Sequence, residues 1–550
     1  MTTKPGAART PASLLSLPIE ILKDICEGLC LHCRIPHVVD APHWVVDEAK
    51  NDQKALSRLS RTCQALRGVA QPIVFHYYHS GSIARIAADS RWEEDSTSVR
   101  CKHRASRFLR AVVLRPDLGL CVKALAFYSL ALGEDPPPAP IRNFIVDLIA
   151  EPFGIGQNDF RRAAESSTDF FSPIGIPHIA SFFCPNVEQL CVGNISMREW
   201  SQREHKLDIW LWPNMSKVRY LAFTSDTIAL GQDDVSNAMD YHFSQAHWYY
   251  ARCPNVETLI AADCGFNWNQ IDHIDMYQII DCTLGWGVKE DLLFNNLRKI
   301  SVDGISPALL QRLIDTSPML EDVEYYYSTQ NWIRIPFPIL KDEHVAGAAS
   351  KLRRFCYSIG RDFVTSTTVE DPEHLLYHVG AGLEEHWFVQ DRQPTCLGSS
   401  RFATLETLEV DQGVLYGPVF ERDEETGEPL NAPIGKQAAD PEGYFLNLLP
   451  ASLRRLRIGL VVGWEELERD LAALARNKTG RFPDLLRIEL EFLREFTPPT
   501  EAISGLRAIM RAEAGIDLSV AVLPKLSGGR GMLPPRPGHP ETIHEAGWKL

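Results

Sequence analysis

The first hydrophobic pattern along the chain predicts a short amphipathic helix that begins at Pro18. Leu22, Ile25 and Leu29 follow at spacings of three and four residues, and Ile21 lies beside them. This spacing gathers apolar side chains on one broad face of a helix. Proline suits the first position of a helix, where its missing N–H costs nothing.

A second amphipathic helix is predicted over residues 55–70, and we expect Gln71-Pro72 to end it. The next residues, 73–79 (IVFHYYH), predict a short strand. A helical module of this size has a small core, so we expect it to bury leftover apolar surface against a partner. The apolar stripe of the second helix comprises Leu56, Leu59, Cys63, Leu66 and Ala70.

The rest of the chain repeats an apolar-x-x-apolar-x-apolar triplet, which predicts short strands. At 45% hydrophobic content many such triplets arise by chance, so the flanking residues carry the inference. In CPNVEQL, CPNVETL, SPMLEDV and FPDLLRI a proline lies two residues before the triplet, and helical stretches precede several copies. The ten triplets begin at Val122, Val187, Val218, Val256, Leu297, Leu320, Leu352, Leu405, Leu453 and Leu485.

A helix, a turn and a strand in repetition predict an array of the leucine-rich-repeat kind, in which each unit stacks on its neighbours. The spacing between copies is irregular, from 23 residues (297 to 320) to more than 50. We therefore expect long loops at 133–140, 361–398 and 421–443. A helix over 501–515 and a strand over 516–523 are predicted to cap the array. A set of unrelated α/β domains is the alternative.

Residues between the apolar positions of each triplet are predicted to share the opposite, substrate-facing side of the sheet. These positions are neutral or apolar in the early copies and charged in the later ones, and an ordinary solvated face is the alternative. We expect charge reversal at Arg455 and Arg457 to weaken partner capture more than changes on the helical side. The candidates are Tyr220, Ile260, Arg354, Glu409, Arg455, Arg457 and Arg487.

Composition narrows the class of protein. The net charge of −15 argues against a nucleic-acid or anionic-membrane binder, which needs clustered Lys and Arg. There is no run of 18 apolar residues, and the first ten residues lack an apolar signal core, so we expect a cytoplasmic or nuclear protein. The 13 scattered cysteines are expected to be reduced thiols.

The sequence contains one cysteine pair with the spacing of a metal or redox motif. Cys30-x-x-Cys33, with Cys26 and His32 nearby, lacks the second ligand pair of a structural zinc site and the βαβ context of a redox motif. We therefore interpret these cysteines as small hydrophobic residues and predict neither a metal nor a cofactor. The usual catalytic motifs are also missing from the sequence. The chain is predicted not to be an enzyme, and a hydrolase hidden in the irregular body is the alternative.

Residues 12–76 resemble the F-box, especially as it occurs in filamentous-fungal proteins. The family pattern matches Leu17, Pro18, Glu20, Ile21, Ile25 and Leu29, and then Leu56, Leu59, Ser60, Cys63, Leu66 and Arg67, with a longer insertion at 31–54. The resemblance implies binding to the Skp adaptor and cullin scaffold of a ubiquitin ligase, with an unknown protein substrate held by the body. The implied Skp-binding residues, which could equally form the module's core, are Leu17, Pro18, Ile21, Ile25, Leu56, Leu59 and Leu66.

The sequence thus predicts an α/β protein with a helical F-box module followed by an irregular leucine-rich-repeat-like solenoid, a horseshoe or arc. The predicted parts are a disordered start (1–11), the module (12–80), a linker (81–105), the solenoid (106–525) and a disordered tail (526–550). A stand-alone interaction scaffold, whose N-terminal helices only cap the array, is the competing interpretation.

Overall fold

The computed structural model describes part of the chain, and the predicted disordered ends and nearly all of the predicted linker lie outside that part. The expected loops at 133–140 and 361–398 also lie outside it. The described residues are 14–40, 49–79, 105, 107–127, 180–193, 215–224, 253–262, 295–303, 314, 317–327, 351–359, 404–412, 420–422, 429–433, 446, 449–461, 464–493 and 497–523.

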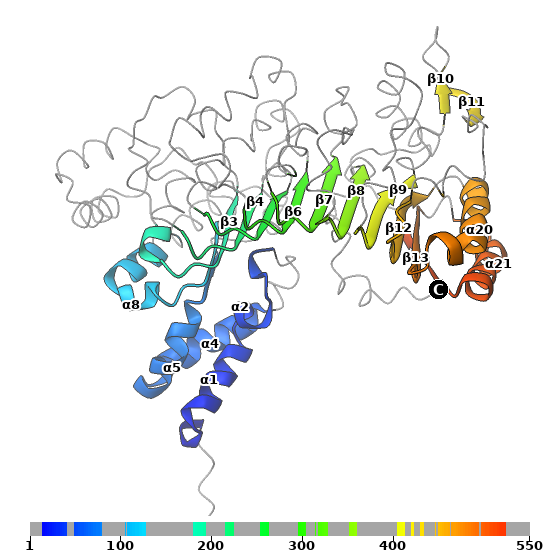
Figure 1. The fold of residues 1–550 in the computed structure, drawn as a ribbon. Helices are drawn as coiled ribbons and strands as arrows, with labels where there is room; N and C mark the ends of the chain where they lie inside the picture. The colour runs from blue at the N-terminus through cyan, green and yellow to red at the C-terminus, as the bar shows by residue number, and fades with distance from the viewer. Residues whose placement is uncertain are drawn as a thin grey trace, which may run out of the picture. The chain divides into compact units, whose positions relative to one another are not determined.

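The fold is α/β, as predicted, with a twelve-stranded parallel sheet whose strands follow the order of the chain (Figure 1). The chain divides into two compact units, residues 1–195 with 206–222 and residues 196–205 with 223–550. The strands are β1 (Tyr77–His79), β2 (Ala124–Phe127), β3 (Gln189–Gly193), β4 (Tyr220–Thr224), β5 (Thr258–Ala262), β6 (Lys299–Asp303), β7 (Asp322–Tyr327), β8 (Arg354–Ile359), β9 (Thr407–Asp411), β12 (Arg455–Val461), β13 (Arg487–Leu493) and β14 (Asp517–Leu523).

All ten predicted triplets coincide with strands, namely β2 to β9, β12 and β13. Their apolar residues whose side chains are described are buried. The register explains why: in the second unit Ile300 pairs with Val323, Val323 with Phe355, and Phe355 with Leu408. Parallel pairing without a shift stacks one apolar residue per strand, so neighbouring strands cover each other's hydrophobic side chains.

The prolines before the triplets mark tight turns. The amide of Val187 donates to the carbonyl of Cys184 over 3.3 Å, and the amide of Leu320 donates to that of Ser317 over 3.1 Å. Each hydrogen bond closes a four-residue turn with Pro185 or Pro318 at its second position, where the fixed φ of proline is favourable. The turn therefore fixes where the strand that follows it begins.

The N-terminal helices belong to the first unit, where α1, α4 and α5 lie beside one another (Figure 1). The prediction of one helix over 55–70 is wrong, because Cys63 is extended (φ −154°, ψ 168°) and separates α4 from α5. Pro72 lies within α5 instead of ending it. The helical elements are η1 (Leu14–Ser16), α1 (Ile19–Gly28), α2 (Leu31–Arg34), η2 (Val38–Asp40), α4 (Lys50–Thr62) and α5 (Gln64–Val74).

The 31–40 part of the insertion joins these helices to the strands of the same unit. Val38 and Val39 of η2 are buried. The side-chain amide of Gln189 donates to the carbonyl of Pro36 over 2.6 Å, and the ring of His37 stacks on Tyr220 with centroids 4.7 Å apart. This part of the insertion is therefore a packing element of the first unit.

The C-terminal elements of the second unit match their predictions. The expected helix over 501–515 is α21 (Thr500–Ile509) with a π-helical turn, η11 (Met510–Ala514), and Gly515 ends it with φ 61°. Glycine adopts this left-handed conformation without a steric penalty. The predicted strand is β14, and α20 (Trp464–Arg481) precedes β13.

Two smaller features complete the described fold. A short helix, α8 (Pro116–Gly119), precedes β2. The loop expected at 421–443 contains instead a two-stranded antiparallel pair, β10 (Phe420–Arg422) and β11 (Pro429–Pro433). Among the described helices, none has the length and apolar character needed to cross a bilayer.

Candidate functional site

The start of the helical region exposes six large apolar side chains, from η1, Leu17 and α1. Leu17, Ile21 and Ile25 lie along one side of α1 and its entry, whereas Ile19 lies about 200° around the helix from Ile21, and we call the whole exposed set the α1 apolar surface. On α1, Ile19, Ile21 and Ile25 are 63%, 44% and 39% exposed. Isoleucines and leucines gathered in this way within a dozen residues typically mark an interaction site. The complete set is Leu14, Leu15, Leu17, Ile19, Ile21 and Ile25.

A neighbouring face of α1 packs into the core of the helical region. Leu22 and Cys26 are buried, and Cys26 shares a hydrophobic cluster with Leu56, Ala70 and Ile73. The apolar stripe predicted for α1 is therefore divided between a buried face and an exposed one. Both faces of this ten-residue helix therefore carry apolar side chains.

The implied Skp-binding residues fall into two groups. Leu17, Pro18, Ile21 and Ile25 are exposed, whereas Leu56 and Leu66 are only 2% and 5% exposed and belong to the core. Leu59 is half-buried against the hydrophobic cluster. Burial therefore places Leu56 and Leu66 in the core of the helical region and leaves Leu17, Pro18, Ile21 and Ile25 accessible.

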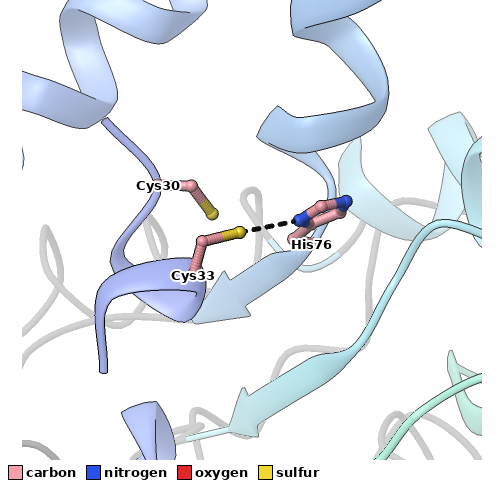
Figure 2. A group of neighbouring side chains, drawn as sticks. All are labelled: Cys30, Cys33 and His76. Atoms are coloured by element: carbon pink, nitrogen blue, oxygen red, sulfur yellow. Dashed lines mark hydrogen bonds between the residues drawn. The ribbon is translucent and has the colours of Figure 1, made fainter. Parts of the chain in front are cut away.

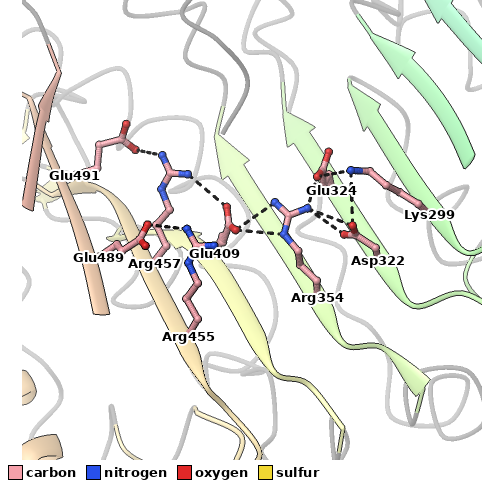
Figure 3. Close-up of polar contacts among 9 residues, drawn as sticks. All are labelled: Lys299, Asp322, Glu324, Arg354, Glu409, Arg455, Arg457, Glu489 and Glu491. Atoms are coloured by element: carbon pink, nitrogen blue, oxygen red, sulfur yellow. Dashed lines mark hydrogen bonds and ion pairs between the residues drawn. The ribbon is translucent and has the colours of Figure 1, made fainter. Parts of the chain in front are cut away.

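A charged strand face lies in the second unit. Its residues come from β6, β7, β8, β9, β12 and β13 and pair with one another across the strands (Figure 3). The register places Lys299, Asp322 and Arg354 in one row, and Glu409, Arg457 and Glu489 in the next. The complete set is Lys299, Asp322, Glu324, Arg354, Glu409, Arg455, Arg457, Arg487, Glu489 and Glu491.

The ion pairs of the charged strand face form a continuous chain through buried and half-buried groups. Arg354 is its centre: its guanidinium donates to Asp322 and Glu409, each over 3.2 Å, and to Glu324. Arg457 continues the chain, with its Nη1 3.5 Å from Glu409 and its Nη2 3.1 Å from Glu491. Lys299 closes the other end on Glu324 at 2.9 Å.

The candidate substrate-facing residues do share one face of the strands, but most already have partners within their own unit. Tyr220 stacks on His37, and Tyr220 and Ile260 are both buried. Arg354, Glu409 and Arg457 are engaged in the ion-pair chain. Arg455 and Arg487 are the more exposed members, and both contact Glu489. A charge reversal at Arg457 would therefore disturb the fold as well as any substrate contact.

The pKa values of two carboxyl groups of this face are shifted in opposite directions. Burial favours a raised pKa for Glu324, but Lys299 and Arg354 outweigh burial and hold the pKa at about 2. Burial raises the pKa of Asp322, and the opposing effect of Arg354 does not cancel it. Lys299 and Arg354 also contact Asp322, but Lys299 lies closer to Glu324 (2.9 Å, against 3.7 Å to Asp322), so these two cations stabilise the Glu324 carboxylate more strongly.

Changing Glu324 to glutamine should lower stability at neutral pH, and the deficit should close on acidification. A carboxyl group with a depressed folded-state pKa stabilises the fold above its ordinary pKa of 4.5, and this contribution is lost as the pH falls towards about 2. Urea unfolding of both proteins between about pH 7 and about pH 3 measures the difference. Glu321→Gln, at an exposed pair with Arg298, is the control with a small effect throughout. A deficit independent of pH would contradict the assignment.

A cluster of two thiols and an imidazole lies in the first unit, at the end of α1 (Figure 2). Cys30 precedes α2, Cys33 belongs to α2, and His76 lies between α5 and β1. The three ligand-type atoms lie within 4.8 Å of one another. Sequence reasoning recognised the cysteine pair but not His76, since nothing local connects residues 43 positions apart.

Comparison with known proteins assigns no family to the chain. No protein-family model matches the chain, and no curated protein matches it either.

Proposed function

We propose that the chain is a substrate-recognition adaptor of a Skp–cullin–F-box ubiquitin ligase. In this proposal the α1 apolar surface binds the Skp adaptor, and the parallel-strand body holds a protein substrate. The chain contributes proximity and no bond-making step of its own: fixing a substrate near a recruited conjugating enzyme raises their effective concentration.

The observation that carries the proposal is the exposure of Leu17, Ile21 and Ile25. They recur every fourth residue, so they lie along one side of the helix and its entry. The F-box resemblance includes these same positions among those that dock the adaptor or form the module's core, and their exposure favours docking. Because these side chains are already partly covered, their burial by a partner gives about 1 kcal/mol each, which contributes to the binding energy of a larger interface.

The two finer parts of the fold assignment belong to the proposal as well. Helices α1, α4 and α5 with their shared core support an F-box module. Strands that begin at a common turn and stack in register support a leucine-rich-repeat-like solenoid with irregular spacing. An exposed apolar surface favours the adaptor over a stand-alone scaffold, because a helical cap should bury its apolar residues on the array it covers.

Replacing Ile21 by glutamate should strongly weaken adaptor binding while leaving the fold intact. A charge at the centre of a desolvated apolar contact costs 2 kcal/mol or more, so we expect the affinity to fall by about 30-fold or more. The measurement is calorimetric titration of the full chain with a purified Skp adaptor, with circular dichroism to check folding.

Leu120→Glu is the matched control, since Leu120 is equally apolar, 53% exposed and in the same unit but outside the α1 apolar surface. It should bind the adaptor as the wild type does. A wild-type chain that fails to bind any Skp adaptor would overturn the proposal and favour the scaffold interpretation. Equal losses from both substitutions would refute the docking surface.

A further inference from the structure

We infer that Cys30, Cys33 and His76 form a zinc-binding site that fastens the end of α1 to the end of α5. The inference is independent of the proposed function, because it involves none of the exposed residues of the α1 apolar surface. The ligands would be the two sulfur atoms and the Nδ1 atom of the imidazole.

The spacing of the ligand atoms suits a tetrahedral ion. With Zn–S bonds of about 2.3 Å and Zn–N bonds of about 2.0–2.1 Å, neighbouring ligand atoms should lie about 3.5–3.8 Å apart. The Sγ atom of Cys33 is 3.3 Å from Nδ1 of His76, and all three ligand atoms lie within 4.8 Å of one another. Small side-chain rotations therefore suffice to close the three around one ion.

The backbone holds each ligand in place. The amide of Cys30 donates to Glu27 at the end of α1 over 3.0 Å, and its carbonyl accepts from Cys33 over 3.1 Å. The carbonyl of His76 accepts from the amides of Lys123 and Ala124, each over 2.9 Å, which ties it to the start of β2. Ligands preorganised in this way lose little conformational entropy on binding a metal.

The donor set selects the metal. Two thiolates and an imidazole are soft or borderline ligands, which favour Zn²⁺ and disfavour Mg²⁺ and Ca²⁺. Binding displaces the two thiol protons to solvent, so that the ion with two thiolates and a neutral imidazole is uncharged overall. A neutral centre suits this location, because Cys30 is buried in the hydrophobic cluster of the helical region.

His32 is the nearest further imidazole and the candidate for the fourth position. Its Nδ1 atom lies 3.9 Å from Sγ of Cys33, and its ring meets that of His76 edge to face with centroids 5.8 Å apart. Rotation of the His32 ring towards the thiols would complete a four-ligand site of the structural type. If His32 does not ligate, a water molecule takes the fourth position.

A zinc ion at this site would cross-link a helical module that has a small core. Cys30 follows α1, and His76 follows α5, so one ion would join the two helix ends that the hydrophobic cluster and the thiol contacts of Cys30 and Cys33 already hold together. Metal binding to a preformed native site stabilises the folded state by mass action, and the gain is largest for small domains.

The test uses the full-length chain purified without a histidine tag and without chelators. Elemental mass spectrometry should find about one zinc ion per chain after dialysis, and loading the reduced apoprotein should release about two protons per zinc ion. Cys33→Ser and His76→Gln should each lower the zinc content at least tenfold, whereas Cys121→Ser, a thiol of the same unit outside the cluster, should leave it unchanged. His32→Ala decides the fourth ligand.

Cobalt substitution provides a readout that a purely structural role of the cysteines would not produce. Co²⁺ in the reduced chain should give thiolate-to-metal charge-transfer absorption and the intense visible bands of tetrahedral coordination, and Cys33→Ser should lose both. Circular dichroism of each variant confirms that it is folded. A reduced wild-type chain that binds neither zinc nor cobalt would overturn the inference, and a Cys30–Cys33 disulfide in the protein as purified, before reduction, would assign the pair to redox chemistry instead.

Discussion

Replacing Arg354 by methionine should lower the free energy of unfolding of the second unit by about 3–5 kcal/mol. The guanidinium of Arg354 contacts three carboxylates, those of Asp322, Glu324 and Glu409, and no other cation contacts as many in the charged strand face. Removing it leaves buried negative charge with too few partners, which costs far more than the loss of an exposed ion pair.

The deficit of Arg354→Met should shrink as the pH falls. Without the cation, the pKa of Asp322, which burial already raises, rises further, and the pKa of Glu324 loses part of its lowering, so protonation relieves the repulsion in the folded chain. Hydrogen–deuterium exchange of peptides from β7, β8 and β9 in the full-length chain measures the local opening free energy.

Two further variants define what Arg354 contributes. Arg353→Met changes the adjacent, exposed arginine and should alter stability by about 0.5 kcal/mol or less. Arg354→Lys keeps the charge but not the planar fork that reaches several carboxylates, and should give an intermediate loss. If Arg354→Met and Arg353→Met had the same small effect, the ion-pair chain would contribute nothing to the fold.

The strands were the part of the fold that the sequence predicted best. The triplet beginning at Leu320 has a proline two residues before it, alternates apolar and charged residues, and becomes β7 with Val323 and Tyr325 buried. Local turn chemistry and a period of two determine such a strand, so no knowledge of distant contacts is required. The same alternation correctly grouped Lys299, Asp322 and Arg354 on one face.

The helix boundaries were predicted less well, because periodicity does not register a single extended residue. The apolar stripe from Leu56 to Ala70 continues through Cys63, where the backbone turns from α4 into α5. Pro72 is tolerated inside α5 because the carbonyl that it leaves unpaired, that of Gly68, lies at an exposed position where water can hydrate it.

The candidate sites depended most on contacts that the sequence does not encode locally. The pairing of Arg354 with Glu409 and the approach of His76 to Cys33 each join residues more than 40 positions apart. A sequence pattern identified the charges and the cysteine pair, but only the fold determines which groups meet. The same limit applied to Leu56 and Ile25, whose apolar character is alike and whose exposure is opposite.

Leu56→Ala and Ile25→Ala should separate the core of the helical region from its docking surface. Leu56 is buried among Cys26, Ala70 and Ile73, so truncation leaves a cavity and should cost about 2–5 kcal/mol. That is a large fraction of the total stability of a small domain. Ile25 is 39% exposed, and its truncation should cost about 1 kcal/mol or less.

The two variants should rank the other way in adaptor affinity: for the folded protein, Ile25→Ala should lower it more than Leu56→Ala. Ile25→Ala should weaken binding at every adaptor concentration, because Ile25 lies in the proposed interface. Leu56→Ala acts through unfolding, so an excess of adaptor should draw the variant back into the folded, bound state. Hydrogen–deuterium exchange of α1 and α5, measured with and without adaptor, reports both effects in the full chain. Fast exchange in Ile25→Ala, or unchanged exchange in Leu56→Ala, would show that the division into core and docking faces is wrong.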